Sequence, residues 1–190
     1  MLFRSHELRT PLNAILGYTR MMRSGLLNAE KREKALETVA RNATSLTQIV
    51  EDVLDVSRII SGKIRLNIEA VELPAIVREA LDTVRPAAEA KHLHIETVID
   101  AEASTVSGDA ERLHQIMWNL LSNAVKFTPR DGRIDVRLAR VASHVEVTVR
   151  DTGIGISPEF LPYVFERFRQ ADSSVSREFG GLGLGLAITR

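Results

Sequence analysis

The chain has 190 residues, enough for one large domain or two small ones, and its 25 Lys and Arg side chains are balanced by 25 Asp and Glu side chains. This zero net charge lacks the basic character that nucleic-acid binding requires, so we expect no nucleic-acid partner. The absence of cysteine excludes disulfides, thiolate zinc sites and cysteine nucleophiles, and no apolar run reaches the roughly 20 residues of a membrane span.

Two helices joined by a short turn are predicted over residues 1–61. Apolar residues recur every seven positions along the second helix, from Asn28 to Ile60, in a seam of Val39, Leu46, Val53 and Ile60 and a companion seam of Leu36, Ala43 and Val50. One helix cannot bury such a stripe, and a single hairpin has too little core, so we expect two copies to form a four-helix bundle. A purely structural coiled coil explains this pattern equally well.

Residues 62–190 have a mixed pattern of helices and strands, and Ser61-Gly62-Lys63 mark the boundary. Period-two alternation predicts strands at 64–68, 134–138 and 145–149, and Leu93 and Ile95 suggest another strand, with its extension to Val98 left open. Helices are predicted over 73–90 and from the N-cap Asp109 to Phe127. Residues 151–185 are rich in Gly and Ser with little periodicity, which favours a functional segment.

His6 is the first candidate for chemistry. A lone histidine near the start of a helix is usually a solvated polar residue, but Glu7 can accept a hydrogen bond from one ring nitrogen and leave the other as a nucleophile. A zinc-binding HExxH motif is excluded, because Thr10 stands where the second histidine would be.

A second candidate lies on the helix that ends at Phe127. Asn119 and Asn123 are four residues apart and Lys126 follows on nearly the same face. Two amide oxygens and a lysine suit a magnesium–phosphate assembly, in which Mg²⁺ keeps several waters and takes few protein ligands. The alternative is that these residues are only the polar face of an amphipathic helix.

Two glycine-containing segments follow. Asp151 comes directly after a predicted strand and can accept hydrogen bonds from an exocyclic amine such as that of adenine, while Gly153 and Gly155 allow close approach of a ligand. Residues 180–185 precede an apolar stretch, where glycine N–H groups at a helix start can bind an anion. This second segment matches neither the Rossmann nor the P-loop motif.

Five segments together resemble the sequence boxes of sensor histidine kinases. SHELRTPLNAI is similar to the H box, NLLSNAVKFTP to the N box, DTGIGI to the G1 box, PYVFERFRQAD to the F box and GGLGLGLAI to the G2 box. They follow the family order at family-like spacing over nearly the whole chain.

The resemblance implies a fold and an activity. The fold is a dimerisation and histidine-phosphotransfer hairpin over residues 1–61, followed over 62–190 by an α+β two-layer sandwich ATP-binding domain of the gyrase, Hsp90, kinase and MutL type, truncated at its C-terminus. The activity is Mg²⁺-dependent autophosphorylation from ATP and phosphoryl transfer to an aspartate of a response-regulator receiver domain. The implied location is the cytoplasm, either as a free protein or as part of a membrane-bound sensor.

The resemblance also implies residue roles. His6 is the phosphoryl acceptor, Glu7 orients or deprotonates it, and Thr10 helps to place water for dephosphorylation of the regulator. Asn123 is a magnesium ligand, Asn119 a metal or phosphate-side contact. The remaining ATP-binding positions are Lys126, Asp151, Gly153, Gly155, Ile156, Phe168, Gly181, Leu182, Gly183, Leu184 and Gly185, with Phe165 and Phe168 holding a lid over residues 169–179.

Two other functions remain open at this stage. The chain could be a non-catalytic module for dimerisation, docking and nucleotide binding, in which case nucleotide would bind without labelling the chain. It could instead be an ATPase of the same superfamily, but Asn119 occupies the position where a water-activating glutamate would be expected.

Overall fold

The computed structural model describes residues 5–25, 27–61, 66–100, 103, 105–169 and 183–189. The chain divides into two compact units, Met1–Lys63 with Arg167–Leu184 and Ile64–Glu166 with Gly185–Arg190. Among the described helices, none combines the length and the apolar character needed to cross a membrane.

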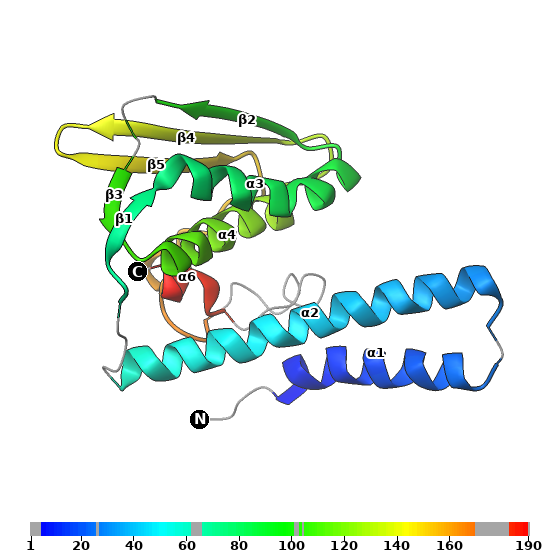
Figure 1. The fold of residues 1–190 in the computed structure, drawn as a ribbon. Helices are drawn as coiled ribbons and strands as arrows, with labels where there is room; N and C mark the ends of the chain where they lie inside the picture. The colour runs from blue at the N-terminus through cyan, green and yellow to red at the C-terminus, as the bar shows by residue number, and fades with distance from the viewer. Residues whose placement is uncertain are drawn as a thin grey trace. The chain divides into compact units, whose positions relative to one another are not determined.

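The first unit contains the predicted helical hairpin, formed by α1 (Ser5–Arg23) and α2 (Ala29–Ile60) (Figure 1). Gly25 has a φ of 71°, a left-handed conformation that glycine adopts without steric cost at the end of a helix. Asn28 then caps α2, since its Oδ1 accepts a hydrogen bond from the Lys31 N–H at 2.9 Å. The two predicted helices and the short turn between them are therefore confirmed.

The apolar residues of α2 fall into two groups with different exposure. Val39, Leu46 and Val53 are half-buried within the hairpin, and the buried apolar residues of the same helix include Ala35 and Ile49. The predicted companion seam is instead exposed: Leu36 is 55% and Val50 is 47% accessible. One stripe thus closes the hairpin, while the other stays open along α2.

The second unit is a layer of helices on a sheet. Strands β2 (His94–Ile99), β4 (Arg133–Val141) and β5 (His144–Asp151) lie in the order β2-β4-β5, with β2 parallel and β5 antiparallel to β4. Helices α3 (Leu73–Ala90) and α4 (Ala110–Phe127) cover one face of this sheet (Figure 1). Both helices and all three strands agree with the sequence predictions.

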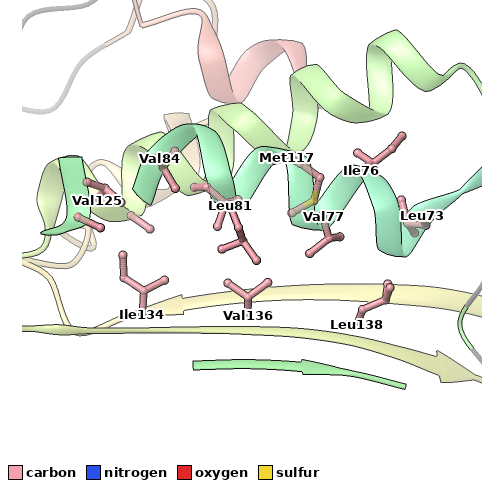
Figure 2. Packing of buried hydrophobic residues seen from close by; sticks show 14 of the residues in the cluster. Leu73, Ile76, Val77, Leu81, Val84, Met117, Val125, Ile134, Val136 and Leu138 are labelled. Atoms are coloured by element: carbon pink, nitrogen blue, oxygen red, sulfur yellow. The ribbon is translucent and has the colours of Figure 1, made fainter. Parts of the chain in front are cut away.

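The core lies between these two layers. Ile134, Val136 and Leu138 alternate along β4 and point towards α3 and α4 (Figure 2), and none is more than 1% accessible. Burying each of these side chains stabilises the fold by about 1.5–3 kcal/mol. The buried face of β4 is therefore the surface on which α3 and α4 pack.

The prediction of a strand at 64–68 is wrong for residues 66–68, which the structure describes. Leu66 and Ile68 belong to no strand and are 54% and 57% accessible, while Ile64 lies outside the described residues. The strand here is β1 (Glu69–Glu72), antiparallel to β3 (Thr105–Gly108), which the sequence analysis missed. Pairing with β3, which buries Val71, decides the position of β1, and that partner is not visible in a local alternation of apolar residues.

Candidate functional site

The start of α4 is fixed by Asp109, as predicted. Its carboxylate accepts the Arg112 N–H at 3.2 Å and also the Asn67 N–H at 2.9 Å, which lies on the segment before β1. These backbone donors, Asn67 first, hold the pKa of Asp109 below its usual value. One ionised side chain thus joins the chain entering this unit to the helix that carries the candidate site.

The polar residues of α4 differ in their burial. Asn119 is buried, at 3% accessibility, whereas Asn123 and Lys126 are half-buried. The Lys126 ammonium lies 5.0 Å from the centroid of the Phe127 ring. The graded burial places the polar face of α4 at the edge of the core rather than on a fully solvated surface.

Asn119 brings the N-box helix together with the end of the glycine-rich segment. Its Nδ2 donates a hydrogen bond to the carbonyl of Gly185 at 3.2 Å, at the start of α6 (Gly185–Ile188). A Cβ atom at residue 185 would lie 3.2 Å from the Asn119 Oδ1, a tight contact that the amide would relieve only by moving a few tenths of an ångström. Two of the segments singled out from the sequence are therefore in direct contact.

The loop after β5 contacts the other end of α4. The Ile154 N–H donates to the Phe127 carbonyl at 3.3 Å, and a Cβ at Gly153 would lie 2.7 Å from that same oxygen. The exposed Asp151 accepts the Gly153 N–H at 2.8 Å, which closes the turn. Gly155 has a φ of 69°, which favours glycine. The G1 segment therefore lies against the backbone at which the N-box helix ends.

Thr152 is a contributor that the sequence analysis missed. Its Oγ1 accepts the Arg133 N–H at 2.9 Å, and its own N–H donates to the Arg133 carbonyl at 3.0 Å. These bonds extend the pairing of β4 and β5 by one residue and fix Asp151 at the end of the strand. The only sequence signal for this role is the position of a hydroxyl residue between Asp151 and Gly153.

The other predicted nucleotide-binding residues follow in the G1, F and G2 segments. Ile156 is 50% accessible. In the first unit, the Phe168 N–H donates to the Gly183 carbonyl at 3.1 Å, with φ values of 62° and 67° at these two residues, and Leu184 is buried. Gly181 and Leu182 lie outside the described residues.

The predicted phosphoryl-transfer residues lie in α1. His6 and Glu7 belong to its first turn, and their side chains are outside the described part of the chain. Thr10 is exposed and precedes the buried Pro11. The backbone thus positions all three residues on a single helix.

The donor groups on α4 fit a nucleotide-bound magnesium ion. Among the described residues, no three or more His, Asp and Glu side chains are grouped so that they could hold a metal. Amide oxygens such as that of the half-buried Asn123 are neutral ligands, and Mg²⁺ accepts one or two protein ligands when water and phosphate oxygens supply the rest.

The fold and the site together define a class of protein. In chain order, a helical hairpin precedes a three-stranded sheet covered by two helices. Two glycine-containing segments contact α4, which carries Asn119 and Asn123. The model of the His Kinase A (phospho-acceptor) domain matches residues 5–62, and that of the histidine kinase-, DNA gyrase B-, and HSP90-like ATPase matches residues 108–190.

Individual relatives agree with both models. The sensor histidine kinase GacS of Pseudomonas protegens is 40% identical over 193 residues, and hybrid signal transduction histidine kinase D of Dictyostelium discoideum is 36% identical over 232. Each alignment covers 98% of this chain, which spans only 21% and 15% of their respective lengths. The full-length ShkA structure in complex with AMPPNP is 34% identical, with a TM-score of 0.69 over 97% of this chain and 38% of that one. This chain belongs to the sensor histidine kinases.

Proposed function

We propose that this chain is the kinase core of a two-component system, which transfers the γ-phosphoryl group of ATP to His6. The observation that carries the proposal is the meeting of the N-box, G1 and G2 segments at α4, through Asn119 with Gly185 and through Phe127 with Ile154. The match of residues 5–62 to a phospho-acceptor domain supports His6 as the target.

The nucleotide roles follow the chemistry of each group. Asp151 ends an ordered strand with an exposed carboxylate, which suits an acceptor for the adenine amine. The tight approach at Gly153 and the left-handed turn at Gly155 leave no side chains in the way of the base. From the family resemblance we assign the exposed Ile156 to an apolar contact with the base, and Lys126, Phe168 and residues 181–185 to the phosphate side.

Two asparagines are assigned to the phosphate end of the site. Asn123 is the proposed magnesium ligand because its half-buried amide stands one turn from Asn119. Asn119 holds the phosphate-side loop through its bond to Gly185, and a role in metal binding remains a prediction for it. When bound, Mg²⁺ supplies positive charge that offsets the charge of the phosphate oxygens.

The proposed reaction occurs at the imidazole of His6. The ring nitrogen without a proton forms a bond to the γ-phosphorus, and the bond from phosphorus to the bridging oxygen breaks, so that ADP leaves with the electron pair. Glu7 accepts the proton from the other ring nitrogen, which prevents a full positive charge on the ring. The protein contributes mainly by positioning the two reactants.

The proposed partners follow from the helical hairpin. Phosphohistidine passes its phosphoryl group to an aspartate of a response-regulator receiver domain that docks on α1 and α2. Thr10 then helps to place water for dephosphorylation of the regulator. A second copy of the chain covers the exposed stripe of α2, which contains Leu36 and Val50. We assign the activity to the cytoplasm.

Labelling with γ-labelled ATP and Mg²⁺ tests this function. The chain should acquire phosphate that is labile in acid and stable in base, and His6→Gln should acquire none. Label that persists in His6→Gln refutes the assignment of the acceptor. Nucleotide binding without any label on the wild-type chain would instead identify a non-catalytic docking module.

A water-activating ATPase is disfavoured by one observation. Asn119 occupies the position where that mechanism requires a glutamate base, and its amide is buried and bonded to Gly185. An amide cannot accept a proton from water at neutral pH. Turnover of ATP to free phosphate by the His6→Gln variant would contradict this argument.

A further inference from the structure

Lys91 lies where α3 ends and its ammonium group reaches the end of α4. The Lys91 N–H bonds to the carbonyl of Ala88 at 3.1 Å, and the half-buried side chain extends to three carbonyl oxygens. Its Nζ donates to Val125 at 2.8 Å, to Lys126 at 2.8 Å and to Thr128 at 3.1 Å. An ammonium group has three N–H donors, and these three bonds match that number.

These bonds complete the hydrogen bonding of the last turn of α4. The final four carbonyls of a helix have no partner within it and must be satisfied from outside. Ala124 accepts from the backbone and hydroxyl of Thr128, and Phe127 accepts from Ile154. The two carbonyls between them are those that Lys91 binds. A positive group here also lies at the negative end of the helix dipole.

The same helix end supports the nucleotide loop. The Phe127 carbonyl holds Ile154, and Gly153 lies so close to Phe127 that a Cβ would come within 2.7 Å of its oxygen. The Lys91 carbonyl also accepts the Asp131 N–H at 3.1 Å, in the turn that leads into β4. A shift at the end of α4 would therefore move the G1 loop and the turn together.

We infer that Lys91 is a positioning residue for nucleotide binding: its ammonium group clamps the end of α4 and so holds the G1 loop in its binding conformation. The inference rests on the proposed function, because it assumes that this loop binds the nucleotide. Lys91 acts through backbone carbonyls and needs no contact with the nucleotide.

The test compares nucleotide affinity in chains that differ at this ammonium group. Lys91→Met keeps most of the apolar stem and removes the charge, and we expect it to raise the Kd for a non-hydrolysable ATP analogue about tenfold at a temperature where the chain is folded. The matched control is Arg85→Met on the same helix, where the cation pairs with the exposed Asp82 at 2.9 Å among the described residues. Its Kd should stay at the wild-type value.

The lack of cysteine allows a direct rescue. Lys91→Cys introduces a unique thiol, and alkylation with 2-bromoethylamine rebuilds an ammonium group of nearly the same length as lysine. We expect the aminoethylated chain to recover the wild-type Kd, while alkylation with an uncharged ethyl group should leave the affinity about tenfold weaker. Faster amide exchange at Ile154 in the nucleotide-free Lys91→Met chain would connect the lost affinity to the loop.

The possible results distinguish failure of the proposed role of Lys91 from failure of the proposed function. If Lys91→Met lowers the melting temperature but leaves the Kd and the Ile154 exchange unchanged, Lys91 is only structural and the inference is overturned. If wild type itself binds no nucleotide, the proposed function fails and the inference falls with it. If Lys91→Met does not fold, Lys91→Arg serves instead, because it keeps the positive charge but displaces the N–H donors. An unchanged Kd in the Lys91→Arg chain, together with altered amide exchange at Ile154, would also overturn the inference.

Discussion

At the scale of single residues, Gly153 is packed tightly against the end of α4. A Cβ there would lie 2.6 Å from the Asp151 Oδ1 and 2.7 Å from the Phe127 carbonyl oxygen. The second of these atoms is backbone and cannot move away without shifting the helix end. The loop itself must therefore give way when any larger residue is introduced.

We expect Gly153→Ala to weaken nucleotide binding about tenfold, or roughly 1.4 kcal/mol, because the displaced loop no longer presents Asp151 to the base. Gly17→Ala is the matched control, since a Cβ there meets nothing within 4 Å inside α1. It should stabilise the helix by about 0.5–1 kcal/mol and leave the Kd unchanged. Titration with a fluorescent nucleotide measures both. Equal affinities for the two variants would place the nucleotide elsewhere.

Asp109 supports a prediction on pH. Its pKa is lowered in the fold because the N–H groups of Asn67 and Arg112 bind the ionised carboxylate. Its contribution to stability is therefore fully present above the ordinary aspartate pKa of 3.8 and is lost as pH falls through the lower folded value. Asp109→Asn keeps a capping oxygen without the charge.

The measurement is the free energy of unfolding in urea at a series of pH values. Wild type should be more stable than Asp109→Asn from neutral pH down to about pH 4, and the difference should shrink as the pH is lowered further. A difference that stays constant from neutral pH to pH 2 would contradict the assigned cause of the shift.

At the scale of elements, a helix or strand can be predicted when its own sequence determines its position, and not when pairing with a distant segment does. Helix α3 was predicted with its observed bounds, because Pro74 begins it and a buried stripe from Leu73 to Ala88 follows the helical period. The strand expected at 64–68 was wrong, because β1 is set by its pairing with β3 and not by its own alternation. Val98 lies in β2, on the exposed face.

Site residues differ in the same way. Candidates in the N-box and G1 segments could be proposed from sequence because their chemistry is carried by short contiguous motifs, and their roles in nucleotide binding stay predictions. Lys91 could not be predicted, because the carbonyls that it binds are 34, 35 and 37 residues away along the chain. Only the packing of α3 beside α4 brings them together.

The exposed stripe on α2 leads to a prediction about assembly. Val50 is 47% and Leu54 is 50% accessible, and they lie one turn apart on the same face. If a second copy covers this stripe, Val50→Asp buries an unpaired charge at the interface, which costs about 3 kcal/mol or more. The dissociation constant of the dimer should then rise at least about 150-fold.

Sedimentation over a range of concentrations measures this change. Thr44→Asp is the matched control, because Thr44 is exposed on another face of α2 and its hydroxyl bonds only to Ala40 among the contacts described for it. That variant should remain as dimeric as wild type. If Val50→Asp also sediments like wild type, the copies associate through a different surface.

At the scale of the whole molecule, the proposed reaction joins two units. His6 lies in α1 of the helical unit, whereas Asn123 and Asp151 belong to the unit built on the sheet. A reaction between separate molecules slows in proportion to dilution, but two groups in one chain or one dimer react at a high effective concentration. The dependence of the labelling rate on protein concentration therefore reports how the two units meet.

We expect His6 to be labelled in a first-order process whose rate constant does not change on tenfold dilution, as long as the dimer persists. Removing Mg²⁺ with a chelator should abolish the label, because the charge of the phosphate oxygens is then no longer offset. The Val50→Asp chain distinguishes phosphorylation within one chain from phosphorylation across the dimer. Full labelling of the monomer means that each chain phosphorylates its own His6, whereas loss of labelling with nucleotide binding retained means that the reaction crosses the dimer. A wild-type rate that falls tenfold on dilution of an intact dimer would contradict both, because the units would then meet only in collisions between dimers.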